Sequence, residues 1–277
     1  MHRILFTCAL VFLAVSAVTA QTPETGAASP SVPVAVRSQA DCAGFIANPN
    51  VPHDVVVVGG ADDDFHSVVR QFVQGDSIYI SSHKGEGPAV GDEFYVVRPA
   101  NDLFLTMHYQ GERWGIRKVG KPYEDVAQVK VTHVNPQGVV ARVSFSCSPI
   151  VPGDTLVPFQ SRAIPNYTLS KPLDHFAPLD KEKEHGRIIA SHNNLGYIGS
   201  QRVVYLNLGE RAGTLPGQRF RIYKIAPSVK TGLLTSRRPP PEIVGEAVVL
   251  SVQARSCAAM VVSSYREISA GDYVEEE

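Results

Sequence analysis

The residues that could do chemistry are scattered along this chain, with no local pattern of a known catalytic motif. The sequence contains neither G-x-S-x-G, which exposes a nucleophilic serine, nor H-E-x-x-H, which holds a zinc ion. Histidines such as His133, His175 and His192 fall mostly in predicted loops, where a solvated surface role is expected. An enzyme needs a convergent set of such groups. The sequence therefore predicts no catalytic residue, no metal site and no cofactor.

The densest group of possible metal ligands is Asp62-Asp63-Asp64 with His66. Apolar residues recur at helical spacing from Phe65 to Val73, so we expect a helix over 62–73 with the aspartates in its first turn. Consecutive residues on a helix point in different directions, which disfavours metal binding. Gly59-Gly60 before this helix resembles a phosphate cradle, but the aspartates would repel a phosphate. Helix capping is the expected role.

Aromatic side chains on one long loop are the best candidates for ligand contact. The segment from Asn101 to Asp125 contains Phe104, Tyr109 and the only tryptophan, Trp114. Aromatic residues on a loop are suited to stacking on sugars or to anchoring a protein partner. They are equally suited to folding back over an open end of a barrel. Both roles remain open at this point.

An internal repeat supplies the elements that must position this loop. Gly153-Asp154 aligns with Gly271-Asp272, 118 residues later, and the match extends back without gaps to Val126 and Val244. Upstream, SIYISSHKGEGPAVGDEFYVVR aligns with VVYLNLGERAGTLPGQRFRIYK at an offset of 126 residues, since Gly91 falls on Gly217. The offsets differ by eight (126 − 118), so the connecting loop is eight residues longer in the first copy.

Each copy shows short β-branched and aromatic runs separated by turn residues, which predicts a mainly β fold of two small, strongly bent or partly open barrels. Glycine permits a positive φ angle at a turn, and an aspartate after it can accept hydrogen bonds from nearby backbone N–H groups. The expected structural turn residues are Gly91, Gly153, Asp154, Gly217, Gly271 and Asp272.

The N-terminus has the basic, apolar and small-residue order of a cleavable signal peptide, ending at Ala20. A Pro-, Ser- and Thr-rich segment follows, which we expect to be flexible. Asp180 to Glu184 lies in a Pro-punctuated stretch that we expect to be an extended linker. The predicted organisation is a signal peptide (1–20), a flexible leader (21–36), a first β unit with a strand-helix lead-in (37–157), a linker (158–185) and a second β unit (186–277).

Three cysteines follow the predicted cleavage site. Cys257 aligns with Val139, an apolar strand position, so we expect it to be buried and inert. Cys147 aligns with Tyr265, just past the same strand, and Cys42 precedes the first copy. We therefore predict a Cys42–Cys147 disulfide, as an exported protein allows.

Charge and hydropathy exclude some classes of partner. The formal net charge is −1, and basic and acidic residues are interspersed, so no basic face for nucleic acid is visible. Beyond the signal peptide, no stretch approaches the roughly 20 apolar residues of a membrane span. We expect a periplasmic or secreted protein that does not insert stably into a membrane.

The second copy also resembles a known family. GRIIASHNNLGYIGSQRVVYLNLG, PGQRFRIYK, IVGEAVVLSV and EISAGDYVE resemble the C-terminal domain of flagellar assembly protein T and repeats of related envelope proteins, some of which carry a LysM module. The first copy is similar more loosely, through VGDEFYVVRP and IVPGD. The resemblance implies SH3-like barrels that act in assembly or binding without catalysis. The chain departs from the flagellar protein because its unit is duplicated and the N-terminal domains have no counterpart.

Three functions are therefore weighed. The first is a non-catalytic envelope scaffold or assembly protein. The second is a module that binds peptidoglycan or another polysaccharide, and the third is a hydrolase with an unrecognised site. The expected partner is an envelope protein or a cell-wall polysaccharide.

Overall fold

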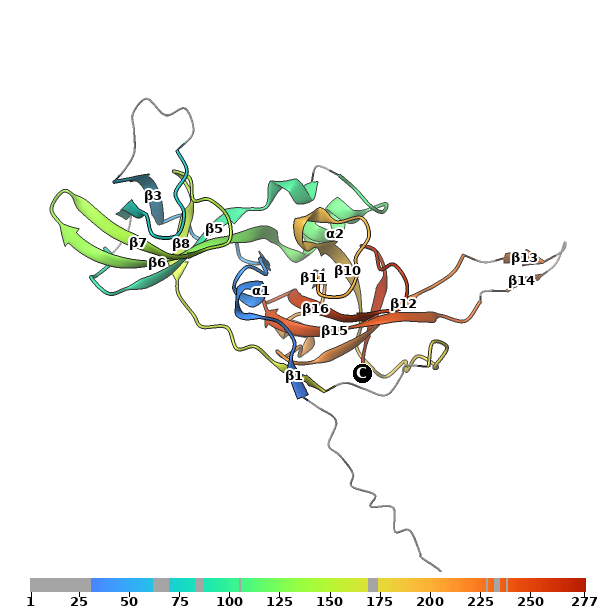
Figure 1. Cartoon of the computed structure of the whole chain (residues 1–277). Coiled ribbons are helices and arrows are strands. Elements are labelled where there is room, and N and C mark those ends of the chain that lie inside the picture. The colour runs from blue at the N-terminus through green and yellow to red at the C-terminus, as the bar shows by residue number, and fades with distance from the viewer. Residues whose placement is uncertain are drawn as a thin grey trace, which may run out of the picture.

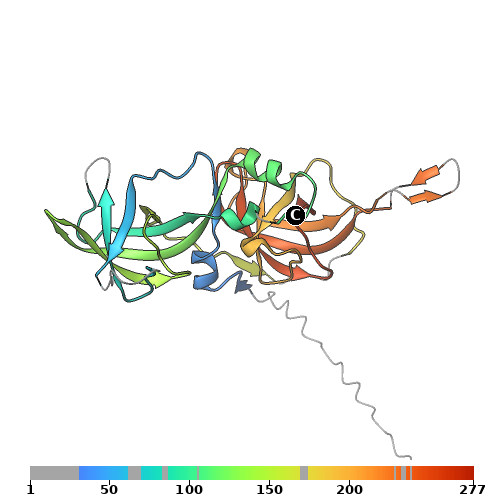
Figure 2. The same cartoon turned by 90° about the horizontal axis from the view of Figure 1, so that it is seen from above.

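The chain folds into two β-barrels arranged end to end, with a short helix over their junction (Figures 1 and 2). The computed structural model describes residues 31–61, 70–82, 87–104, 106–168, 174–227, 229–231, 235–237 and 239–277. The mainly β fold in two tandem units is confirmed, and hydrogen-bonded pairing closes both barrels completely.

The first barrel is a ring of six antiparallel strands, with a seventh strand, β2 (Phe45–Ala47), added on the outer side of β6. Around the ring, the strands are β3 (Val55–Gly60), β4 (Ser77–Ser82), β7 (Gly138–Ser146), β6 (Lys121–Asn135), β5 (Glu93–Pro99) and β8 (Thr155–Pro158). β3 precedes the aligned part of the first copy and is nevertheless a member of the ring.

The second barrel has the same order of strands. Around its ring lie β10 (His185–Ser191), β11 (Val203–Leu206), β16 (Cys257–Ser264), β15 (Glu242–Val252), β12 (Arg219–Lys224) and β17 (Tyr273–Glu276). The connection from β12 to β15 carries a hairpin of β13 (Val229–Thr231) and β14 (Thr235–Arg237), which projects from the barrel (Figure 1).

Irregularities in the pairing recur at equivalent positions of the two copies. The β6–β7 register shifts between Gln128 and Val129, and the β15–β16 register shifts 118 residues later, between Glu246 and Ala247. A bulge strengthens the local twist of a strand, so its position is part of how a small barrel closes. Shared bulges as well as shared order support the duplication predicted from the sequence.

The predicted glycine turns have the expected geometry. Gly91, Gly153, Gly217 and Gly271 have φ angles of 97°, 95°, 85° and 100°. Asp154 accepts a hydrogen bond from the Val151 N–H at 2.9 Å, and Asp272 accepts one from the Ser269 N–H at 2.8 Å. The side chain thus closes the turn that leads into the last strand of each barrel.

Each barrel contains its own apolar core, and a third core lies between the barrels. Val96, Val126 and Ile150 belong to the first core, and Phe220 and Ile222 to the second. The core at the junction combines residues from both units: Val34, Ile46, Leu103, Ile116 and Val119 from the N-terminal half, and Ile189, Tyr205, Val248 and Met260 from the second barrel. Its burial fixes one barrel against the other.

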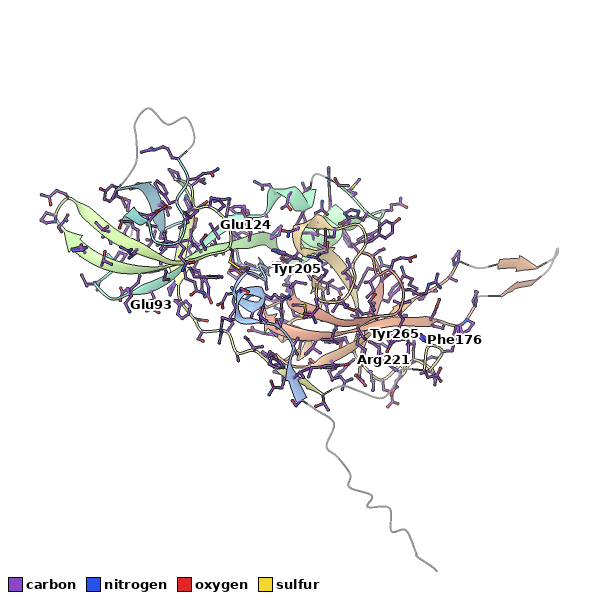
Figure 3. All side chains as sticks on the ribbon, viewed as in Figure 1. Glu93, Glu124, Phe176, Tyr205, Arg221 and Tyr265 are labelled. Carbon is purple, nitrogen blue, oxygen red and sulfur yellow. A yellow bond between two sulfur atoms is a disulfide. The ribbon has the colours of Figure 1, made fainter. Side chains whose placement is uncertain are left out.

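Hydrogen bonds reinforce this junction. The Tyr205 hydroxyl donates to the Ala43 carbonyl oxygen at 2.8 Å, and Figure 3 places Tyr205 between the two units. Gly44 has a φ of +67°, and a side-chain carbon there would lie 2.5 Å from the Tyr205 hydroxyl oxygen. A larger residue at position 44 would therefore have to displace the Tyr205 side chain and would be strained at this positive φ.

One prediction about the segments outside the barrels needs correction. Ser31–Pro33 forms β1, which pairs with β9 (Asn166–Thr168) from the predicted linker, and Val34 and Ala35 are buried in the junction core. The C-terminal end of the expected flexible leader is therefore part of the fold, because two small apolar residues gain burial there. Residues 21–30 lie outside the described residues.

The helix predicted over 62–73 falls mostly outside the described residues. In its described part, Phe72 forms an isolated antiparallel bridge with Ile150, as Ile198 does with Ile268 in the second barrel. The ring of Phe72 packs so closely on Gly60 that a side-chain carbon there would be 2.2 Å away. A helix in the described part of the lead-in is α1 (Arg37–Asp41).

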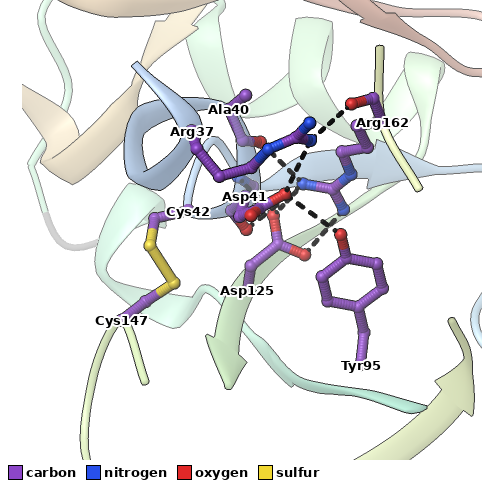
Figure 4. Close-up of a disulfide and its surroundings, with 9 residues drawn as sticks. Arg37, Ala40, Asp41, Cys42, Tyr95, Asp125, Cys147 and Arg162 are labelled. Carbon is purple, nitrogen blue, oxygen red and sulfur yellow. Dashed lines mark hydrogen bonds and ion pairs between the residues drawn. A yellow bond between two sulfur atoms is a disulfide. The ribbon is translucent and has the colours of Figure 1, made fainter. Parts of the chain in front are cut away.

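The predicted Cys42–Cys147 disulfide is present and joins α1 to the end of the first barrel (Figure 4). Beside it, Arg162 from the predicted linker donates to Asp125 in a two-bonded ion pair and lies 4.8 Å above the ring of Tyr95. Burial raises the pKa of Tyr95 to about 12. Cys257 is buried with a free thiol, as expected, and burial raises its pKa as well.

Candidate functional site

The predicted aromatic loop forms a 3₁₀ turn, η1 (Asn101–Phe104), and a helix, α2 (Glu112–Val119). Gly111 precedes α2 with a φ of 88°, which glycine tolerates. Glu112 begins the helix and Lys118 lies in its last turn, a charge order that complements the helix dipole. The Glu112 carboxylate accepts hydrogen bonds from the backbone N–H groups of His108 and Tyr109, which holds the loop against the helix.

The two faces of α2 have different roles. Ile116 and Val119 are buried in the junction core, so this face covers the second unit. Trp114 lies on another face and is 68 % exposed. The aliphatic residues of the loop thus cover the neighbouring barrel, whereas Trp114 is exposed to solvent, and the role of Trp114 in ligand contact stays a prediction.

A cleft of about 1090 Å³ lies between this loop and the second barrel. The first unit contributes Tyr109, Trp114 and Lys118 to its wall, and the second contributes the start of β10, the end of β12 and the start of β17. The side chains that matter most in the second unit are His185, Arg187, Asn207, Arg211, Tyr223, Arg255 and Tyr273.

Arg187 contacts aromatic rings of both units in the cleft. Its guanidinium lies 4.5 Å from the centre of the Tyr273 ring and 5.7 Å from that of Tyr109, and it donates to the Tyr273 hydroxyl. Its backbone N–H donates to the side-chain oxygen of Asn207 at 2.6 Å. Cation–π contacts from both units therefore hold one guanidinium in a fixed position.

Aromatic rings surround this arginine. Tyr223 and Tyr273 are stacked, with ring centres 5.5 Å apart and planes 18° apart. On the opposite wall, Lys118 Nζ lies 5.0 Å from the centre of the Trp114 ring. Burial raises the pKa of Tyr223, and the neighbouring Glu275 adds to this effect. Burial also raises the pKa of Tyr109, so both phenols are neutral hydrogen-bonding groups at neutral pH.

The residues predicted from the sequence are brought together in part. Tyr109 and Trp114 both line the cleft, and the ring of Tyr109 packs on the predicted turn residue Gly271, 3.0 Å from where a side-chain carbon would stand. Phe104 ends η1, and its side chain lies outside the described structure. The other predicted turn residues shape the barrels and do not line this cleft.

Sequence reasoning did not single out the wall formed by the second barrel. In the second barrel, Tyr273 is the cross-strand partner of both Arg187 and Tyr223. At the equivalent places of the first barrel, Thr155 is the cross-strand partner of Val56 and Val97. A comparison of the copies at these strand positions would have shown basic and aromatic residues where the first copy has small or aliphatic ones. That difference was the available signal.

The described residues contain no group of three or more histidine, cysteine, aspartate or glutamate side chains that could hold a metal ion. Asp62, Asp63, Asp64 and His66 lie outside that part of the chain. His185 does line the cleft, where its Nε2 is 2.7 Å from the Asp180 carbonyl oxygen and its Nδ1 is 3.3 Å from the Tyr223 hydroxyl.

Fold and cleft together define a tandem double-barrel protein with an aromatic, basic cleft at the barrel junction. The sequence matches no protein-family model and no curated protein. Among the described residues, no helix is long and apolar enough to cross a membrane. The disulfide is compatible with a location outside the cytoplasm.

Proposed function

We propose that this protein is a non-catalytic, exported cell-envelope protein that binds cell-wall polysaccharide in the cleft between its barrels. The observation that carries the proposal is the convergence of aromatic side chains from both units on one cleft, with Trp114 68 % exposed. Exposed aromatic residues on a rigid support are frequent anchors in recognition sites.

The size of the cleft favours an extended ligand. Pockets for small molecules usually measure about 300–1,000 Å³, and this cleft, at about 1090 Å³, lies just above that range. Sugar rings present flat apolar faces and polar edges, which suit a wall that alternates phenol rings with arginine and asparagine side chains. The polysaccharide function, second among those weighed from the sequence, is therefore preferred here to the scaffold.

The scaffold function retains one specific observation in its favour. Phe176 is 62 % exposed and Tyr265 is 47 % exposed, and both lie on the second barrel at a distance from the junction (Figure 3). His175, which precedes Phe176 in the chain, packs edge-on against Tyr265 with ring centres 4.8 Å apart, so Phe176 and Tyr265 lie in the same part of the surface. A protein partner that docks on exposed aromatic residues would use this surface.

The test is co-sedimentation of the mature protein, from Gln21 onward, with purified peptidoglycan sacculi. We expect wild type to pellet with the sacculi and Trp114→Ala to bind at least about tenfold more weakly, since an aromatic anchor typically contributes about 2 kcal/mol. The melting temperature should be unchanged, because the Trp114 side chain is mostly solvent-exposed.

The matched control is Phe176→Ala, which removes a similarly exposed aromatic ring outside the cleft and should leave pelleting unchanged. If wild type stays in the supernatant, the polysaccharide proposal is wrong. The search then moves to protein partners by crosslinking in intact envelopes, with Phe176→Ala as the variant expected to lose them.

A further inference from the structure

The charge of the cleft specifies its ligand more closely than the aromatic residues do. Its wall carries Lys118, Arg187, Arg211 and Arg255, and none of the described residues that line it is an aspartate or a glutamate. The chain as a whole has 26 lysines and arginines against 27 aspartates and glutamates. The surplus of positive charge is therefore a local feature and does not follow from composition.

Several arginines elsewhere in the described structure are paired with carboxylates. Arg98 lies 2.6 Å from Asp154, Arg219 lies 2.8 Å from Glu246, and Arg266 lies 2.8 Å from Glu242. Arg162 and Arg221 are likewise paired, with Asp125 and Glu275. Within the described part of the chain, none of the four cleft cations has a carboxylate within ion-pair distance. Positive charges left without partners in a concave site attract anions.

Arg187 is prepared for a carboxylate. Its guanidinium lies within cation–π distance of both Tyr109 and Tyr273, and the described structure uses only one of its N–H groups, in the bond to the Tyr273 hydroxyl. A guanidinium has five N–H donors in a planar fork that matches the two oxygens of a carboxylate. Because the side chain is already ordered, little conformational entropy is lost on binding.

Two further cations of the same cleft, Arg211 and Arg255, have exposed side chains. Arg255 donates to the Lys118 carbonyl oxygen at 3.2 Å, so the second barrel and α2 are joined at this rim. Arg211 belongs to η3 (Glu210–Ala212) of the second barrel. Positive charge is thus distributed along the cleft, as a polymer with repeated negative groups would require.

We infer that the cleft is selective for a carboxylated glycan, with Arg187, Arg211 and Arg255 as the carboxylate-binding residues. This inference rests on the proposed polysaccharide function and adds the chemical class of the ligand. Aromatic rings would hold sugar faces, and the guanidinium groups would read the acidic substituents. Free carboxyl groups of the wall polymer, on its sugars or its peptides, share this chemistry.

The experiment compares native sacculi with sacculi whose carboxyl groups have been converted to neutral amides by carbodiimide coupling. Both preparations keep the same sugar backbone, so only the charge of the ligand changes. We expect wild type to bind amidated sacculi at least about tenfold more weakly, and added salt to weaken binding to native sacculi because it screens exposed charges.

Protein variants test the same inference from the other side. Arg211→Gln combined with Arg255→Gln removes two exposed cleft charges and should weaken binding to native sacculi at least about tenfold, at an unchanged melting temperature. Arg266→Gln is the matched control, since it removes one exposed charge outside the cleft and should bind like wild type. Arg187→Gln should show the largest loss.

The two proposals fail in different ways. Equal, Trp114-dependent binding to native and amidated sacculi would overturn the carboxylate inference and leave the polysaccharide function standing. Absence of binding to native sacculi would overturn the polysaccharide function itself. Wild-type binding by the Arg211/Arg255 double variant would also contradict the inference.

Discussion

The ionisation of His192 is coupled to folding. It lies at the junction, with Nδ1 3.4 Å from the Tyr205 hydroxyl. Burial lowers the pKa of His192, and Arg202 adds to that effect, whereas Asp125 and Asp102 oppose it. In the unfolded chain, an ordinary histidine takes up its proton near pH 6.5. Just below that pH the unfolded state therefore binds more protons, and stability falls as pH falls.

We therefore predict that His192→Gln reduces the loss of stability on acidification. Between pH 7.5 and 5.5, wild type should lose up to about 1.4 kcal/mol more unfolding free energy than the variant, the bound for a histidine that stays neutral in the fold. Urea denaturation at both pH values measures this difference. His133→Gln, at an exposed position, is the control and should track wild type. An acid sensitivity that His192→Gln leaves unaltered would rule out this residue as its source.

At the scale of elements, the turns before the second strand of each barrel differ in the residue that adopts a positive φ angle. Gly75 has a φ of 97°, and its N–H donates to the Val143 carbonyl oxygen. Gln201 occupies the equivalent place, 126 residues later, with a φ of 62°, and its N–H donates to the Val261 carbonyl oxygen. In this left-handed region, backbone strain costs a residue with a side chain about 1–2 kcal/mol of stability. Glycine avoids that strain but loses more backbone entropy on folding, which costs about 0.5–1 kcal/mol.

Reciprocal exchange between the copies tests this balance. Gln201→Gly should raise the free energy of unfolding by about 0.5–1 kcal/mol, and Gly75→Gln should lower it by a similar amount. No atom lies within 4 Å of a side-chain carbon built at Gly75, so the second change acts through the backbone conformation alone. Urea denaturation of both variants measures the effects. Shifts of the same sign in both would contradict the explanation.

The elements could be predicted from the sequence where their signals are local. Alternating β-branched residues and Gly-Asp turns identified the strands, and comparison of the copies assigned Cys257 to a core and Cys42 to Cys147. The pairing of β1 with β9 could not be predicted, because two three-residue strands far apart in the chain carry no periodicity. Composition alone suggested flexibility for Val34 and Ala35, which the junction buries.

Only part of the candidate site could be predicted from the sequence. Loop position and residue type pointed to Tyr109 and Trp114. Arg187, Tyr223 and Tyr273 lie on strands, where the alternation of side chains shows two faces but does not show which face meets another unit. That information depends on how the barrels pack, which no single strand encodes.

At the scale of the whole molecule, the junction makes the two barrels one structural unit. Its core draws apolar side chains from the lead-in, α2 and the second barrel, and the bond from Tyr205 to Ala43 crosses it. We predict that the barrels unfold together. Hydrogen exchange should therefore give opening free energies for β4 and β11 that agree within about 1 kcal/mol.

Tyr205→Phe tests this coupling. The change leaves the buried Ala43 carbonyl without its donor, so we expect a loss of about 1–3 kcal/mol. The loss should appear in both β4 and β11, as measured by hydrogen exchange. Tyr197→Phe, at a position 79 % exposed, is the control and should change neither strand. Reduced protection confined to β11 would show that the barrels open independently.

The two walls of the cleft come from parts of the chain in which the two copies differ. One wall is the segment that is eight residues longer in the first copy, and the other is a set of strand ends whose basic and aromatic residues have no counterpart in the first copy. A single barrel of either kind would supply only one wall of the cleft. The proposed recognition site therefore depends on both copies and on the differences between them. Exchanging the order of the two copies would keep every barrel strand but separate the two walls.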